Sequence, residues 1–287
     1  MEKEFHNHMR IPWHDYTRKS IGRPITEASL SEKASIIGRT GIMLLSCGTG
    51  AWRVRSSMNT LARELGITCT ADIGLLSIEY TCIDGGNCYT ESLCLFNTGV
   101  NTSKLYRMEE FVNKFAGNCK KMSGDELHTL LDRIHEIHGF YSPPFLGLAA
   151  AVACCAFTFL LGGGPVEMFC AFLGAGAGNY LRAKMNQHHL TLFLCTAASV
   201  ALACIVYTIA FTALKSGFHV SIHHQAGYIC SMLFIIPGFP FITSGIDLAK
   251  LDMRSGLERL TYAIIIISVA TLAAWMLALV LHLKPMD

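Results

Sequence analysis

The sequence predicts an α-helical integral membrane protein with five transmembrane helices, one of them broken by proline, preceded by an N-terminal cytosolic α+β domain. Two observations favour this class. Only 15% of the 287 residues are charged, 52% are hydrophobic and the mean hydropathy is +0.40, whereas soluble domains carry about 25% charge. The charges also concentrate in residues 1–140, and long stretches after Phe145 carry none. The chain therefore divides into a polar domain, 1–140, and a membrane domain, 141–287.

The polar domain has clear helix signals. Ser29 or Ser31 is expected to cap the first helix and Gly48 to end it, while Ser123 and Glu126 have the spacing of a capping box. The predicted helices cover residues 30–46, 57–65, 108–115 and 124–138.

A β-hairpin is predicted in the same domain. Two β-rich stretches, 73–81 and 89–96, flank Asp84-Gly85-Gly86-Asn87, which has the composition of a tight turn. The N-terminal stretch MEKEFHNHMRIPWHDY has no apolar core, so it is not expected to be a signal peptide. This domain is therefore expected to stay in the cytosol, where its cysteines remain reduced thiols.

Five apolar stretches predict the membrane spans. A helix rises 1.5 Å per residue, so the shortest of them are near the minimum length for crossing a bilayer. Pro143 and Pro144 mark the start of the first span, and a Gly-Gly-Gly-Pro turn separates it from the second. The spans are expected at about 145–161, 166–181, 190–214, 226–248 and 262–283.

The distribution of positive charge predicts the orientation. With the N-terminus in the cytosol, most Lys and Arg of the membrane domain fall on the inner side, as the positive-inside rule requires. An odd number of spans then places the C-terminus outside. The inner residues are Arg182, Lys184, Lys250, Arg254 and Arg259, and the outer ones are Lys215 and Lys284.

The second predicted span contains small residues and two polar candidates. Cys170, Gly174 and Gly178 recur every four residues and favour close packing of two helices. Glu167 is either a carboxylate that couples transport to an ion or an interfacial group that reaches the outer water. Asn179 is expected to bond either a substrate or, preferably, a neighbouring helix.

The fourth predicted span is interrupted by Ile236-Pro237-Gly238-Phe239-Pro240. Proline removes a backbone donor and disrupts a helix, and broken helices occur at membrane depth where protein or a water-filled cavity surrounds them. We expect Pro237, Gly238, Pro240, Thr243, Ser244 and Asp247 to line a substrate path. The alternative is a kink that serves packing alone.

Charged residues follow the broken span at its inner end. Asp247, Asp252 and Arg259, with Ser255, either bind or gate a polar solute or form a solvated, salt-bridged loop. His219, His223 and His224 have spacing that a metal site could use, but no carboxylate or Cys accompanies them, so no metal site is expected.

Several function classes are disfavoured. The sequence contains no GxxxxGK[ST], GxSxG or HExxH motif, so we expect neither an enzyme nor a cofactor. The net charge of +2 and the lack of a basic run argue against nucleic acid. The remaining classes are a transporter, a channel or a scaffold.

Over most of its length, from about 35 to 260, the chain resembles the N-terminal module of the threonine/serine exporter family, which includes a two-component succinate exporter. Three stretches carry the resemblance, namely residues 44–66, residues 235–248 and residues 247–260. The second of them, IIPGFPFITSGIDL, resembles the family's Pro-Gly-x-Pro segment. The matching residues are Gly48, Arg53, Val54, Ala62 and Gly66 in the first stretch and Asp247, Asp252, Ser255, Gly256 and Arg259 in the last.

The resemblance implies gradient-driven export of threonine/serine-type amino acids or of dicarboxylates such as succinate, in a bacterial inner membrane. It also implies that the chain is the larger subunit of a split exporter, which needs a smaller hydrophobic membrane subunit, contacts lipid and forms an oligomer. Gly50 and Arg55 stand where the family tends to have acidic residues, which leaves open whether this motif handles substrate. The alternatives are a membrane-anchored cytosolic sensor or enzyme domain and a structural membrane assembly protein.

Overall fold

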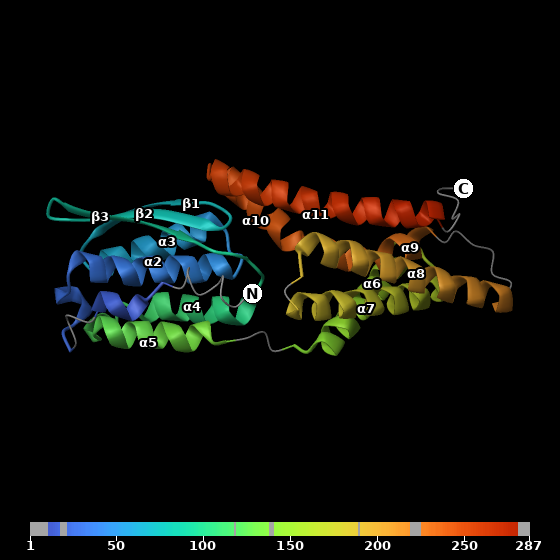
Figure 1. The fold of residues 1–287 in the computed structure, drawn as a ribbon, viewed down its shortest axis with the longest axis horizontal. Helices are drawn as coiled ribbons and strands as arrows, with labels where there is room; N and C mark the ends of the chain where they lie inside the picture. Colours follow the sequence, from blue (N-terminus) through green and yellow to red (C-terminus); the bar gives the residue numbers. More distant parts are fainter. Residues whose placement is uncertain are drawn as a thin grey trace. The chain divides into compact units, whose positions relative to one another are not determined.

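The computed structural model describes residues 11–17, 22–117, 119–137, 141–188, 190–218 and 225–280 (Figure 1). The chain forms two compact units. Unit 1 combines residues 1–139 with 239–260, and unit 2 combines residues 140–238 with 261–287. Unit 1 therefore contains a segment, 239–260, that begins within the predicted proline break. The division of the sequence at residue 140 stays a prediction.

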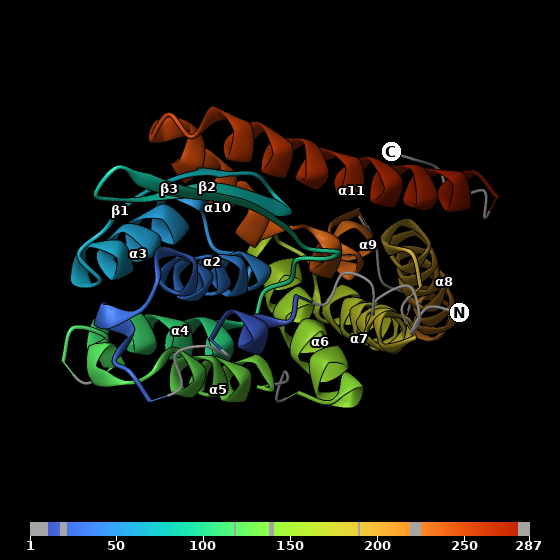
Figure 2. The ribbon, with the colours of Figure 1, turned by 60° about the vertical axis from the view of Figure 1, so that its left-hand side comes forward.

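Unit 1 is built in layers (Figure 2). A three-stranded antiparallel sheet of order β1-β2-β3 covers one side of α2 and α3, and α4 and α5 pack on the other side. The strands are β1 (Thr68–Ile73), β2 (Ser77–Asp84) and β3 (Asn87–Cys94). The helices are α2 (Leu30–Ser46), α3 (Ala51–Glu64), α4 (Thr102–Lys114) and α5 (Gly124–His135), with short 3-10 helices η1 (Trp13–Thr17), η2 (Ile25–Glu27) and η3 (Cys119–Lys121).

Several local predictions for unit 1 are confirmed. Ser29 caps α2 by accepting the Glu32 amide, and Ser123 forms the capping box that opens α5. The hairpin joins β2 to β3, with Asp84 opposite Asn87 and both turn glycines at positive φ. Strand β1 was not predicted, and α3 begins six residues before the predicted start at residue 57.

The sheet and α2 are joined by one closely fitted tyrosine. Tyr80 of β2 is 1% exposed, and its hydroxyl lies 3.0 Å from the Ala34 carbonyl oxygen and 2.7 Å from a Glu91 carboxylate oxygen. A Cβ at Gly38 would lie 2.2 Å from that hydroxyl, so α2 needs glycine there. Burial and the Glu91 charge raise the pKa of Tyr80 above its ordinary value.

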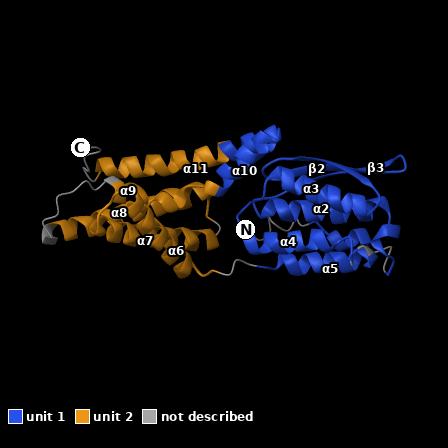
Figure 3. Ribbon diagram, turned by 180° about the vertical axis from the view of Figure 1, so that it is seen from behind, with its two compact units in different colours: residues 1–139, 239–260 blue, residues 140–238, 261–287 orange. Residues whose placement is uncertain are grey.

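Unit 2 is a helical bundle centred on α7 (Figure 3). A Cβ on Gly174 or Gly178 would lie 2.7 Å from the carbonyl oxygens of Ala203 or Ser199 on α8, so the small-residue stripe is a packing surface between two helices. The elements are α6 (Pro143–Leu160), α7 (Pro165–Gln187), α8 (Leu192–Phe218), α9 (Gln225–Ser231) and η4 (Leu233–Ile235). Helices α10 (Gly238–Ala249) and α11 (Met253–Val280) complete the chain, and unit 2 includes α11 from Thr261.

The expected five spans are confirmed only in part. Among the described residues, three helices are long and apolar enough to cross a membrane, namely Pro143–Leu160, Leu192–Lys215 and Met253–Val280. A fourth crossing arises if Ala226–Ile235 and Gly238–Ala249, which bend at their junction, count as one broken span. Helix α7 is not among them, because Asn179, Arg182 and Lys184 shorten its apolar stretch.

The histidines at 219, 223 and 224 and the last residues of the fifth predicted span, 281–283, lie outside the described residues.

Candidate functional site

The proline break is a genuine interruption of helix. Residue Ile236, which precedes Pro237, is extended with ψ 120° after the 3-10 helix η4, as expected for a residue before proline. Helix α10 then begins at Gly238, so Pro240 lies in its first turn, where a missing backbone donor costs no hydrogen bond. The two prolines therefore end one helical segment and open the next.

The two hydroxyls after the break both bond to backbone. The Thr243 hydroxyl donates within its own helix, 3.0 Å from the Phe239 carbonyl oxygen and 3.2 Å from that of Pro240. The Ser244 hydroxyl donates to the Gly256 carbonyl oxygen of α11 at 2.8 Å. Ser244 therefore holds α10 against the start of α11, and a ligand at either residue would compete with these bonds.

Asp247, Ser255 and Arg259 form a buried network, which we call the clasp. Asp247 is fully buried and Arg259 is 2% exposed. The Asp247 Oδ2 atom accepts the Ser255 hydroxyl at 3.0 Å and lies 3.3 Å from Arg259 Nε. Arg259 Nε in turn donates to Ser255 Oγ at 3.0 Å. Each ionic group thus has a counter-ion as well as a hydrogen bond, which a buried charge requires.

The clasp holds the turn between α2 and α3. Arg259 donates to the carbonyl oxygens of Gly48 at 3.0 Å and Thr49 at 2.8 Å, and the Ala51 amide donates to Asp247 Oδ2 at 3.1 Å. A carboxylate at the first turn of α3 also interacts favourably with the helix dipole. Gly48 ends α2 as predicted and has φ +83°, a conformation that favours glycine.

One oxygen of the Asp247 carboxylate takes no part in the clasp. Asp247 Oδ1 is buried and has no hydrogen-bond partner among the described residues. It faces Gly50, where a Cβ would lie 2.8 Å away. An unsatisfied buried acceptor is costly, so this oxygen is a position where an additional donor would be stabilising.

The predicted inner mouth does not form one cluster. Asp252 pairs with Arg55 at 2.5 Å instead of with Arg259, and Arg53 pairs with Glu109 at 2.7 Å. The structure therefore brings together Gly48, Asp247, Ser255 and Arg259, and it places Asp252 and Arg53 in separate ion pairs.

The two polar candidates of α7 lie far from each other. Glu167 accepts the Gly164 amide at 2.7 Å and is 7% exposed, and its Oε1 atom has no hydrogen-bond partner within the part of the chain that the structure describes. Asn179 donates to the Leu146 carbonyl oxygen at 2.7 Å, the helix contact that the sequence favoured. Twelve residues of helix separate them by about 18 Å, so they do not form one site.

Arg182 of α7 was missed as a candidate. Its guanidinium donates to the Phe234 carbonyl oxygen at 3.3 Å, within the 3-10 segment just before the break. A cation at the end of a helical segment stabilises its free carbonyl groups. In the sequence, Arg182 counts only as an inner positive charge, because its partner lies 52 residues away.

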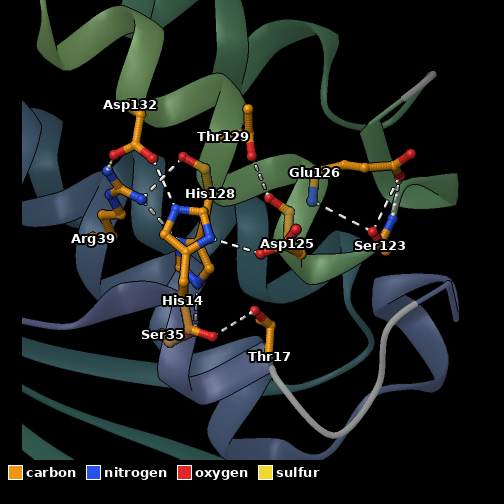
Figure 4. Close-up of polar contacts among 10 residues, drawn as sticks. All are labelled: His14, Thr17, Ser35, Arg39, Ser123, Asp125, Glu126, His128, Thr129 and Asp132. Atoms are coloured by element: carbon orange, nitrogen blue, oxygen red, sulfur yellow. Dashed lines mark hydrogen bonds and ion pairs between the residues drawn. The ribbon is translucent and has the colours of Figure 1, made fainter.

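A second polar cluster joins η1 to α2 and α5 (Figure 4). His14 lies 2.6 Å from an Asp125 carboxylate oxygen and 2.8 Å from one of Asp132, and hydrogen bonds to the two carboxylates raise its pKa. Arg39 also pairs with Asp132. These contacts hold the N-terminal 3-10 helix on the helical layer.

The Ser35–His128 pair in this cluster does not have the geometry of an activated nucleophile. Arg39 donates to His128 Nδ1 at 3.2 Å, so the ring proton is on Nε2, and Nε2 donates to Ser35 Oγ at 3.1 Å. Ser35 in turn donates to the Glu32 carbonyl oxygen. Burial and the Arg39 charge lower the pKa of His128 to about 3, so the pair forms a neutral structural network.

Comparison with known proteins gives two matches. The family model of threonine/serine exporters matches residues 35–282. The Escherichia coli protein named "Probable succinate transporter subunit YjjP" is 23% identical over 223 residues, which cover 76% of this chain and 83% of that protein. No solved structure matches the chain.

Proposed function

Because the chain belongs to the threonine/serine exporter family, we propose that it exports small polar metabolites across a membrane. The substrates are amino acids of the threonine/serine type or dicarboxylates such as succinate, the cargo in the relative's name. An ion or proton gradient drives export, consistent with the lack of a P-loop in the sequence. The apolar helices and the family support a multi-pass membrane protein.

The observation that carries this proposal is the continuity between the break and the clasp. One short helix, α10, connects Pro237 and Gly238 to the fully buried Asp247. Broken helices provide substrate sites in transporters because their free ends offer partial charge. The path therefore follows Pro237, Gly238, Pro240, Thr243, Ser244 and Asp247.

The clasp acts as the cytosolic gate of this path. A buried ion pair is weak evidence for stability, since apolar residues of similar volume often stabilise as well or better. A gate, in contrast, needs a contact with two arrangements of similar free energy. In the proposal, the second arrangement arises when an incoming donor bonds the Asp247 oxygen that has no partner among the described residues.

Glu167 is the coupling residue of the proposal. It is a nearly buried carboxylate with one oxygen that has no described partner. Its helix, α7, packs against the candidate spans α6 and α8, and carboxylates within a membrane bundle often carry protons. Asn179 supports the helix that bears it.

The chain works as the larger subunit of a split exporter in a bacterial inner membrane. The relative is named as a subunit, which supports a smaller hydrophobic partner in the same membrane. The N-terminus lies in the cytosol, as the distribution of Lys and Arg predicts, and the C-terminus lies outside if the number of spans is odd, as in the five-span prediction.

The test is uptake into inverted vesicles under an imposed proton gradient. Vesicles would carry this chain alone, the chain with its small partner, or the chain with Pro237→Ala and Pro240→Ala. Labelled threonine, serine and succinate are the substrates. Pro143→Ala is the matched control, because Pro143 opens a different helix, α6.

We expect gradient-dependent uptake of at least one substrate that requires the partner, falls in the double variant and persists in the control. A Glu167→Gln variant should retain downhill flux and lose the response to the gradient. Absence of uptake of all three substrates, with both chains inserted and folded, would contradict the proposal.

A further inference from the structure

A pocket of about 470 Å³ lies on unit 1, apart from the clasp. Its long wall is one face of α3, and its short wall is the turn that follows α10. The wall from α3 consists of Trp52, Arg55, Ser56, Asn59, Thr60 and Arg63, and the turn contributes Lys250 and Asp252.

The α3 wall follows from helical periodicity. The six residues recur at intervals of three and four positions, so they share one face. The opposite face carries Val54, Met58 and Leu61, all fully buried in the core. Burial of that apolar face turns the polar face of α3 outward, toward the pocket.

The turn that closes the pocket is equally well defined. The Asp252 amide donates to the Asp247 carbonyl oxygen at 2.9 Å and the Leu251 amide to the Leu248 carbonyl oxygen at 3.1 Å, the pattern of a Schellman motif. Leu251 has φ +63°. This turn aims the side chains of residues 250 and 252 at α3.

Two contacts then position the charges. The Lys250 ammonium lies 3.9 Å from the centre of the Trp52 ring, and Asp252 pairs with Arg55 at 2.5 Å. Arg55 Nε also donates to the Ala71 carbonyl oxygen at 3.1 Å. The one carboxylate of the pocket is thus neutralised by one of its three cations.

Lys250 and Arg63 provide the excess positive charge. They stand at opposite ends of the α3 face, and between them lie three neutral side chains, Ser56, Asn59 and Thr60, that both donate and accept hydrogen bonds. Within the described part of the chain, the ion pair of Arg63 is a long one of 3.9 Å, to Glu64, and the Arg63 side chain is exposed. Two separated cations with a neutral polar centre match a ligand that has a negative charge at each end.

We propose that this pocket binds a small dicarboxylate. One carboxylate lies against Lys250 near the Trp52 ring, the other lies against Arg63, and the hydroxyl and amide groups contact the middle. The inference rests on the proposed function, because it assigns a binding site to one of its two substrate classes. A threonine zwitterion has no net charge, so it gains less from two cations.

Binding is tested separately from transport. The full chain, in nanodiscs of phosphatidylcholine, would be titrated calorimetrically with succinate, threonine and inorganic phosphate. The variant is Arg63→Gln with Lys250→Gln, which spares the Arg55–Asp252 pair. The matched control is Arg107→Gln, which removes an exposed charge from α4 outside the pocket.

Succinate should bind, threonine and phosphate should bind at least about tenfold more weakly, and the double variant should lose about tenfold in succinate affinity. The control should be unchanged, and affinity should fall as salt rises. Succinate should also change Trp52 fluorescence, a signal that Trp52→Phe removes.

Equal affinity for threonine or phosphate, or an unchanged affinity in the double variant with native thermal stability, would overturn the pocket assignment. Such a result leaves the exporter proposal intact if vesicles still transport. Succinate binding at the pocket without any vesicle uptake would instead contradict the proposed function alone.

Discussion

Asp247 and Ala51, which are 196 positions apart in the sequence, are joined by a 3.1 Å hydrogen bond from the Ala51 amide to the Asp247 carboxylate. The first turn of α3 is therefore capped by a side chain from α10. This bond makes the start of α3 depend on the segment that follows the proline break, and residues 239–260 belong to the same unit as α3.

Asp247→Ala should destabilise unit 1 strongly. It leaves Arg259 buried without its counter-ion and removes the cap of α3, and breaking one partner of a buried pair costs about 3–5 kcal/mol. Thermal unfolding in detergent measures the change. Asp247→Asn, which keeps the shape, should lose less than Asp247→Ala. The exposed control Glu109→Gln should change stability by less than about 1 kcal/mol. An Asp247→Ala protein as stable as that control would show that the clasp does not support unit 1.

Gly50→Ala tests the close approach of Asp247. A Cβ at this position would lie 2.8 Å from Asp247 Oδ1, so the carboxylate must move away from the Ala51 amide, and we expect a loss of about 1–3 kcal/mol. The control is Gly245→Ala in α10, where nothing lies within 4 Å of the new methyl group and alanine favours helix. Equal stability of the two variants would contradict the proximity of Gly50 to Asp247.

Local sequence signals predicted only the elements whose ends are locally determined. Helices α2 and α5 are capped by Ser29 and Ser123, each within three residues of the amide it bonds. The start of α3 was missed because Gly50 provides no side chain and its cap comes from Asp247. The resembled family tends to have an acidic residue at position 50, and such a side chain would lie close to the Asp247 carboxylate, because a Cβ there is 2.8 Å from Asp247 Oδ1.

In the candidate site, too, the local pattern was predictable from the sequence and the long-range contacts were not. The pattern that includes Asp247, Ser255 and Arg259 was recognised, but the sequence does not reveal that Arg259 bonds the carbonyl oxygens of residues 48 and 49. The sequence shows Arg55 only as a departure from the family's acidic residue. Its ion pair with Asp252 is visible only in the folded structure. Long-range partners of this kind depend on tertiary packing, which periodicity and spacing do not encode.

His14→Gln should destabilise the contact of η1 with α5 in a pH-dependent way. Hydrogen bonds to Asp125 and Asp132 raise the folded-state pKa of His14 above 6.5. Its contribution is therefore fully present below pH 6.5 and is lost as pH rises through the folded pKa. Because His14 is about half exposed, we expect less than about 1 kcal/mol.

The measurement is the difference in unfolding free energy between wild type and His14→Gln at pH 6 and pH 9. The difference should be larger at pH 6. His188→Gln, an exposed histidine on unit 2, serves as the control. A larger difference at pH 9 would show that His14 does not bind the carboxylates as an imidazolium.

Leu251→Gly should stabilise the turn that closes the pocket. Leu251 has φ +63° and is 82% exposed, so its side chain contributes little packing while its left-handed backbone costs about 1–2 kcal/mol. Glycine removes this cost and loses about 0.5–1 kcal/mol through greater freedom of the unfolded chain, which leaves a net gain of about 0–1.5 kcal/mol. Leu257→Gly is the opposing control, because Leu257 is half exposed within α11, where glycine weakens the helix. The thermal unfolding temperature should therefore rise for Leu251→Gly and fall for Leu257→Gly. A lower unfolding temperature in both variants would mean that the Leu251 side chain, and not its backbone conformation, determines the stability of this turn.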